Sequence, residues 1–179
     1  MTTIVAVKTD DKVTFAWDSQ ITWRGRAMNS ADSAGKVFRN GPVVFGVSGR
    51  SRTSDILKHM SIPDRKEYAP DYDTETWIVT ELVPHIIKEL DKVKFFENST
   101  ADSESHVILA VDNLVGYLST DLAWVTDETG IYAVGSGSAY AIGALSTGSA
   151  PEQAVRIAKT WDLYTGGQVR TATVEELLA

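Results

Sequence analysis

Hydrophobic and polar positions alternate in two runs at the start of the chain, which is the pattern of half-buried β-strands. The alternation covers Thr2–Lys8 and Lys12–Asp18, and the turn-forming Thr9-Asp10-Asp11 separates the two runs. This order predicts an N-terminal β-hairpin. The same region predicts three further elements: a strand that ends near Arg39, a strand over Val43–Val47 after the turn Asn40-Gly41-Pro42, and a helix over about Thr53–Met60.

A helical period follows in the middle of the chain. Residues 61–72 contain two prolines and are expected to form a loop, and Asp73 then stands at an N-cap position. Apolar residues recur at helical spacing from there, which predicts a helix from Thr74 to about Val93. Pro84 is expected to kink this helix or to mark its first, irregular part. The polar stretch Glu97–Ser105 is expected to be a loop.

The second half of the chain returns to strands and then to two helices. The order of strands, helix, helix, strands, helix, helix and strand predicts an α+β fold with antiparallel hairpins. We expect a single domain over residues 1–179, because this length is typical of one domain. The expected elements are strands over His106–Val111, Leu114–Ser119, Trp124–Asp127, Ile131–Gly135 and Gln168–Thr173, and helices over about Ala139–Leu145 and Pro151–Asp162.

Composition narrows the classes of function. The net charge of −7 argues against a nucleic-acid partner, and no apolar run approaches the ~20 residues that span a membrane. The N-terminus lacks the basic start and apolar stretch of a signal peptide. The chain has no cysteine, which excludes disulfides, thiolate nucleophiles and cysteine zinc sites. We therefore expect a cytoplasmic protein with no membrane contact.

Charge is unevenly distributed along the chain. Residues 1–60 hold 9 Lys/Arg and 5 Asp/Glu, whereas residues 61–179 hold 8 and 19. One interpretation is two differently charged parts of a single surface. The other is a pair of complementary faces that meet when copies of the chain assemble.

Few residue types are available for catalysis. The three histidines share no metal-ligand spacing, and the chain has no GxGxxG after a strand, no P-loop and no HExxH motif, so no metal or other cofactor is expected. A Ser-His-Asp triad is conceivable, but Gly135-Ser136-Gly137 is one residue too short for a nucleophile elbow. Removal of Met1 would expose an α-amine on Thr2 with a pKa of about 7.7–8.0. Such an amine can serve as general base for the hydroxyl of its own residue.

An ordered set of motifs resembles the N-terminal threonine hydrolases, in particular HslV and the proteasome β-subunits. The resemblance extends over nearly the whole chain and is weakest across residues 61–130. It rests on Thr2-Thr3-Ile4-Val5-Ala6-Val7, Val13–Gln20, Lys36-Val37, Gly46-Val47-Ser48-Gly49, Gly135-Ser136-Gly137, Asp162, Thr165-Gly166-Gly167 and Thr173–Leu177.

The resemblance implies a role for each matched residue. Thr2 would be the nucleophile and, through its amine, the base. Lys36 would lower the pKa of the Thr2 hydroxyl, and Asp18 would pair with Lys36. The Gly49 N–H would donate to the oxyanion of the tetrahedral intermediate. Taken without the motif set, Asp18 and Lys36 could be an ordinary ion pair and Gly49 a turn residue.

The remaining roles concern support and substrate. The resemblance implies a polar cluster around the Thr2 amine, made of Ser136, Asp162 and Thr165. It also implies a substrate pocket that includes Val47, Thr22 and Ser48.

The resemblance further implies a fold and an assembly. The fold would be a four-layer αββα sandwich, in which two antiparallel sheets are flanked by helix pairs. The chain would be a threonine endopeptidase and the protease subunit of an ATP-dependent ring, a stacked double hexamer or a related ring. Its partner would be an AAA+ unfoldase such as HslU, and its substrates would be unfolded polypeptides.

Two other functions stay open at this point. Trp17 stands where a glycine is usual before the aspartate, which would place a large ring next to the site. Together with a retained Met1, it would favour a ring-forming homologue without activity. The second alternative is an amidase that acts on a small molecule, since other N-terminal nucleophile hydrolases have that activity.

Overall fold

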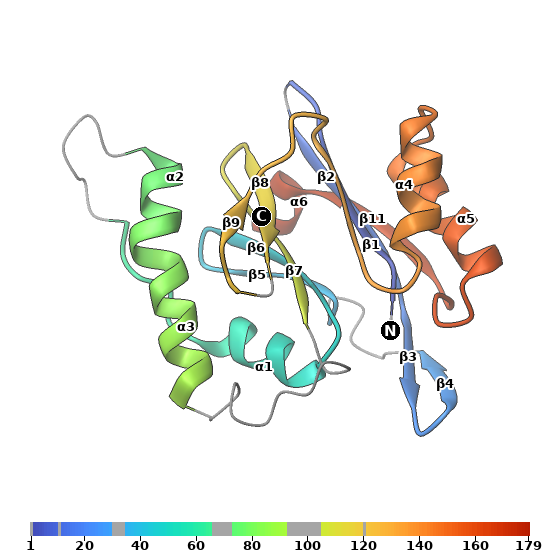
Figure 1. Ribbon diagram of the computed structural model, residues 1–179, viewed down its shortest axis with the longest axis horizontal. Coiled ribbons are helices and arrows are strands. Elements are labelled where there is room, and N and C mark those ends of the chain that lie inside the picture. Colours follow the sequence, from blue (N-terminus) through green and yellow to red (C-terminus); the bar gives the residue numbers. More distant parts are fainter. Residues whose placement is uncertain (1, 11, 30–34, 66–72, 93–104, 120) are drawn as a thin grey trace.

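A computed structural model describes residues 2–10, 12–29, 35–65, 73–92, 105–119 and 121–179 (Figure 1). Its described strands form two antiparallel sheets and a separate hairpin. The first sheet has the order β10 (Ile131–Val134), β1 (Ile4–Lys8), β2 (Val13–Asp18), β11 (Val169–Thr173). The second has the order β5 (Val37–Asn40), β6 (Val43–Ser48), β7 (His106–Val111), β8 (Leu114–Leu118), β9 (Trp124–Val125).

The N-terminal hairpin predicted from alternation is confirmed. β1 and β2 pair antiparallel from Ile4 opposite Trp17 to Lys8 opposite Val13. The strand expected over Trp124–Asp127 is shorter than predicted, because only Trp124 and Val125 pair with β8. The other predicted strands of both sheets agree with the structure to within two residues at their ends.

The helices come after β6, after β10 and after β11 in the chain. The described helices are α1 (Ser51–His59), α2 (Thr74–Trp77), the π-helical segment η1 (Ile78–Leu82), α3 (Val83–Lys92), α4 (Ser138–Ser146), α5 (Pro151–Trp161) and α6 (Val174–Leu178). None of the helices in the described ranges is both long enough and apolar enough to cross a membrane.

The long helix expected from Thr74 is continuous but irregular before Pro84. Asp73 caps it as predicted, since its carboxylate accepts from the N–H of Thr76 at 2.7 Å. The N–H of Val83 then donates to the carbonyl of Ile78, five residues back, which is a π-helical bond. The irregular segment ends at α3, whose second residue is Pro84. The predicted end at Val93 and most of Glu97–Ser105 and 66–72 lie outside the described residues.

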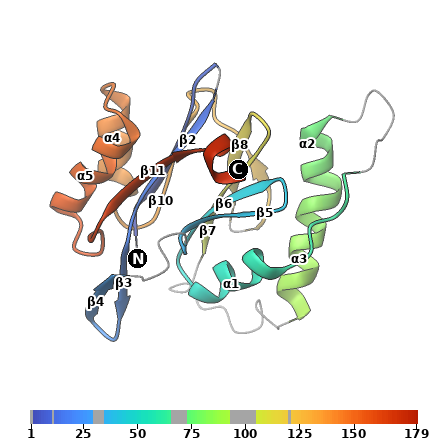
Figure 2. The same cartoon turned by 180° about the vertical axis from the view of Figure 1, so that it is seen from behind.

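Both faces of the first sheet are buried, because successive residues of a strand point to opposite faces. Ile4 and Phe15 belong to a core that lies between the two sheets. Val5 and Ala16 belong to a core shared with α4 and α5. A third core, which includes Phe45, joins the other face of the second sheet to α1, η1 and α3. Figures 1 and 2 show α1, α2 and α3 on one outer side of the paired sheets and α4 and α5 on the other, whereas α6 packs against the core between the sheets. The fold is therefore mixed α and β.

Three elements were not predicted: the two strands of a hairpin and a short C-terminal helix. The hairpin β3 (Gln20–Trp23) and β4 (Arg26–Asn29) turns at Arg24-Gly25, both with positive φ, which is a two-residue hairpin turn. All four residues of β4 are exposed, so the segment has no alternation to detect. Helix α6 begins with a capping box in which Thr173 accepts from the N–H of Glu176 at 3.2 Å.

Candidate active site

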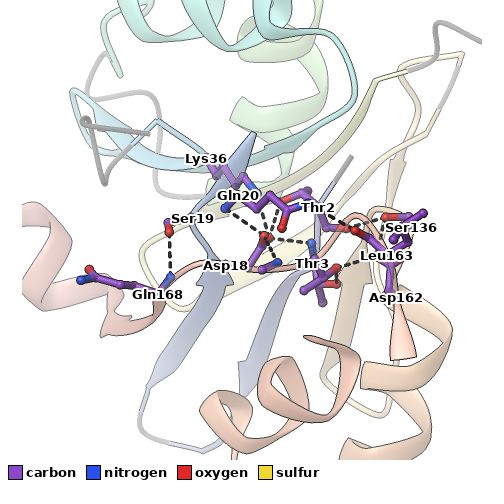
Figure 3. A network of polar contacts seen from close by, with 12 residues as sticks. Thr2, Thr3, Asp18, Ser19, Gln20, Lys36, Ser136, Asp162, Leu163 and Gln168 are labelled. Atoms are coloured by element: carbon purple, nitrogen blue, oxygen red, sulfur yellow. Dashed lines mark hydrogen bonds and ion pairs between the residues drawn. The ribbon is translucent and has the colours of Figure 1, made fainter. Parts of the chain in front are cut away.

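A buried carboxylate organises the proposed site. Asp18 is the last residue of β2, and it is 0% exposed. Figure 3 shows it within a network of polar contacts that includes Thr2, Thr3 and Lys36. Oδ1 accepts from Thr2 Oγ1 at 2.5 Å, Lys36 Nζ at 2.8 Å and the N–H of Thr3 at 2.9 Å, and Oδ2 accepts from the N–H groups of Gly166 at 2.9 Å and Gln20 at 3.1 Å. The carboxylate is therefore held in one orientation.

Lys36 lies beside the predicted nucleophile, as expected. It immediately precedes β5, and the N–H of Val47 donates to its carbonyl at 2.8 Å, so the lysine is fixed to β6. Its ammonium and the Thr2 hydroxyl bond to the same oxygen of Asp18. The Lys36 side chain is 13% exposed. Burial lowers its pKa below the usual lysine value, and the negative charges of Asp18 and Asp162 oppose part of that effect.

The predicted supporting cluster also comes together. Ser136 follows β10, Asp162 is the C-cap of α5, and Thr165 lies in the turn before β11. The Ser136 hydroxyl donates to Asp162 Oδ2 at 2.6 Å, and the Thr165 hydroxyl donates to the same atom. Ser136 also lies 3.4 Å from the carbonyl oxygen of Thr2. The cluster therefore contacts the proposed nucleophile at the backbone carbonyl of Thr2.

Sequence reasoning missed a member of this cluster. Thr3 Oγ1 lies 2.6 Å from Thr165 Oγ1, and Thr3 is 0% exposed. A polar residue directly after the proposed nucleophile, at the start of a predicted strand, was the signal in the sequence that could have identified it.

Glycines in the segment after β10 allow the close approach to β1. Gly135 has φ +97°, and a Cβ there would overlap the carbonyl oxygen of Thr2. A Cβ at Gly137 would overlap Thr3 Oγ1 and lie 2.9 Å from Thr165 Oγ1. The motif Gly135-Ser136-Gly137 thus places Ser136 against Thr2 in a way that side chains at its flanks would prevent.

We expect Gly135→Ala to lower the free energy of unfolding by at least about 2 kcal/mol, because the methyl both overlaps Thr2 and strains a positive φ. Gly143→Ala is the matched control. It lies in α4, where a Cβ would meet nothing within 4 Å, so we expect a gain of about 0.5–1 kcal/mol. Urea denaturation followed by tryptophan fluorescence measures both. Equal effects of the two substitutions would contradict this account of the motif.

A cavity of about 280 Å³ opens beside Thr2. The predicted pocket residues Val47, Ser48 and Thr22 line it, together with Gly49 and Lys36. Ser48 Oγ and Thr22 Oγ1 are buried and have no hydrogen-bond partner among the described residues. Buried hydroxyls without a partner are costly, so these two are suited to bond a molecule that enters the cavity.

Trp17 does not occupy the place expected for it. Trp17 is 5% exposed and belongs to the core between the sheets, and it is not among the residues that line the cavity. Strand alternation explains the difference: Trp17 shares the face of Phe15, and Asp18 takes the opposite face. The large side chain is therefore compatible with an open site.

Among the described residues, no group of three His, Asp or Glu is placed to hold a metal ion.

Known structures resemble this chain closely in fold and distantly in sequence. BPH from Thiobacillus denitrificans, in complex with epoxomicin, has a TM-score of 0.73 at 20% identity, covering 96% of this chain and 97% of its own. Another structure of that protein gives 0.72 at 18%, with the same coverage. The eukaryotic HslV from Trypanosoma brucei gives 0.63 at 22%, covering 96% and 98%. The chain has the HslV-like fold. No family model and no curated protein sequence matches it.

Proposed function

We propose that this protein is a threonine endopeptidase that hydrolyses peptide bonds through the hydroxyl of an N-terminal Thr2. One observation supports this most directly: the Thr2 hydroxyl and the Lys36 ammonium bond to the same oxygen of buried Asp18, beside a cavity. A hydroxyl next to a fixed positive charge is easier to deprotonate. The HslV-like fold makes this the chemistry that the site fits best.

The proposed reaction begins with removal of Met1, which leaves a free α-amine on Thr2. The neutral amine takes the proton of Oγ1 as this oxygen attacks the peptide carbonyl carbon. The Gly49 N–H donates to the resulting oxyanion, an interaction whose loss typically costs about 10²–10³ in rate. The peptide C–N bond then breaks, and the leaving nitrogen takes the proton from the α-ammonium. Water hydrolyses the ester on Thr2 with the amine again as base.

The carboxylates of Asp18 and Asp162 would each position one of the groups that act on Thr2. Asp18 holds Lys36 in place through its ion pair and is itself held by backbone N–H groups. Asp162, with Ser136 and Thr165, would orient the α-amine from the other side of Thr2. Val47, Thr22 and Ser48 would contact the substrate on the cavity wall.

The architecture and assembly extend the proposal. We propose a single domain over residues 1–179 with the four-layer αββα sandwich. We also propose a stacked double hexamer or a related ring, fed with unfolded polypeptide by an AAA+ unfoldase of the HslU kind. Two large apolar side chains that flank Asp162 support a subunit contact: Trp161 is 70% exposed and Leu163 is 81% exposed.

A peptide epoxyketone tests the function directly. Such a reagent offers two electrophilic carbons, and an N-terminal threonine offers two nucleophiles, its hydroxyl and its amine. We expect one adduct per chain, which peptide mass mapping places on Thr2. An intact mass that retains Met1, without an adduct, would favour an inactive ring-forming homologue. Turnover of small amides without turnover of peptides would favour an amidase.

We expect high salt to weaken assembly and peptidase activity together. The excess of positive charge in residues 1–60 and of negative charge in residues 61–179 would attract neighbouring copies, and at 1 M salt the Debye length is only ~3 Å. Sedimentation velocity across a salt series, with hydrolysis of an uncharged peptide by the same samples, measures both. Full activity from a monodisperse monomer would refute the link between ring and activity.

A further inference from the structure

Thr3 connects the two halves of the proposed site. Its backbone N–H donates to Asp18 Oδ1 at 2.9 Å, on the side of Lys36. Its side-chain hydroxyl lies 2.6 Å from Thr165 Oγ1, on the side of Asp162. Thr3 is therefore hydrogen-bonded to both Asp18 and Thr165, and it is covalently attached to Thr2.

The direction of the hydrogen bonds follows from proton counting. Thr165 has one hydroxyl proton, and this proton is donated to Asp162 Oδ2. Thr165 Oγ1 must therefore accept in its contact with Thr3, so the Thr3 hydroxyl is the donor. The bonds run in one direction from Thr3 to Thr165 to Asp162. Without the Thr3 hydroxyl, Thr165 would have no donor from this side.

The packing around this hydroxyl leaves no room for an alternative. Thr3 is 0% exposed, and Thr165 is 4% exposed, so water does not replace a lost partner easily. A Cβ at Gly137 would overlap Thr3 Oγ1, so glycine is the residue that leaves space for it. The site is therefore built around the hydroxyl of Thr3 as well as around its backbone.

We infer that Thr3 is a positioning residue for the reaction at Thr2, an inference that rests on the proposed threonine peptidase function. Its hydroxyl holds Thr165 in one rotamer, and Thr165 in turn holds Asp162 toward the α-amine of Thr2. Its N–H ties the same short segment to Asp18. Thr3 acts through these groups and does not contact the reacting atoms.

The experiment compares Thr3→Val, which removes the hydroxyl at nearly constant shape, with Thr3→Ser, which keeps the hydroxyl. Thr171→Val is the matched control, because this threonine lies on β11 of the same sheet and its hydroxyl donates to the carbonyl of Phe15 at 3.1 Å. We expect Thr3→Val to lower kcat by about 10–100-fold with KM within about twofold, since small misplacements have effects of this size. Thr3→Ser should recover most of kcat, and Thr171→Val should match the wild type.

A second readout does not depend on activity. Three-bond NMR couplings report the χ1 rotamer of Thr165, and we expect one rotamer in the wild type and in Thr3→Ser, and averaging in Thr3→Val. A fixed rotamer in Thr3→Val, or equal losses of kcat in Thr3→Val and Thr3→Ser, would overturn the inference. A wild type that neither cleaves peptides nor reacts with the epoxyketone would overturn the proposed function instead, while the couplings would still decide the positioning role.

Discussion

Thr2→Ala is expected to lower peptide hydrolysis by at least about 10³-fold and to abolish the epoxyketone adduct, because it removes the proposed nucleophile. Alanine is small, so removal of Met1 should still occur. Asp18 keeps four of the five donors that the described residues give it, and the loss of one hydroxyl bond should cost only about 1 kcal/mol of unfolding free energy. Hydrolysis of a fluorogenic peptide and thermal unfolding by circular dichroism measure the two effects.

The conservative variant Thr2→Ser supplies the control for this result. It retains both the hydroxyl and the α-amine, so it should keep measurable activity and form the adduct. Turnover by Thr2→Ala at the wild-type rate would show that another group is the nucleophile.

Lys36→Ala is expected to have the second large effect, a loss of hydrolysis of at least about 10²-fold together with a lower stability. The substitution removes the charge that activates the Thr2 hydroxyl, and it leaves a carboxylate that is 0% exposed without its cation. Breaking a buried ion pair on one side typically costs about 3–5 kcal/mol. We expect a loss of unfolding free energy at the low end of that range, because backbone N–H groups still donate to Asp18.

Two controls separate charge from other effects. Lys36→Met keeps most of the aliphatic stem, so a similar loss of activity in this variant assigns the effect to the charge. Lys159→Ala removes an exposed lysine that donates to the carbonyl of Gly167 at 2.7 Å, and it should leave hydrolysis unchanged. Chelators should have no effect on the wild type. Inhibition by EDTA would instead indicate a metal-dependent reaction.

Much of the secondary structure could be predicted because its signals are local. The alternation of Val13–Asp18, the cap at Asp73 and the proline that begins α5 involve neighbours in the chain, and all three are confirmed. The hairpin β3–β4 was missed because its exposed strand lacks alternation, although Gly25 in a two-residue turn was a readable signal. The π-helical bond from Val83 was not itself predicted, although Pro84 indicated an irregular first part of the helix.

The candidate site was predicted through the motif set and not through local physics. The structure brings Thr2, Asp18 and Lys36 together, and it gathers Ser136 with Asp162 and Thr165, as the motifs implied. Their catalytic roles remain predictions. No local pattern could indicate that backbone groups would also hold the Asp18 carboxylate. Its donors include N–H groups, and every residue except proline carries such a group.

The sequence by itself determined most of the strands, most of the helices and the types of residue that could perform the chemistry, because periodicity, caps and side-chain chemistry belong to short stretches of chain. The tertiary structure alone decided which of those residues meet. The N–H of Gly166 reaches Asp18 across 148 positions, and Thr3 reaches Thr165 across 162. Such contacts arise when two sheets and their helices bury a common core, and the direction of Trp17 into that core is part of the same packing.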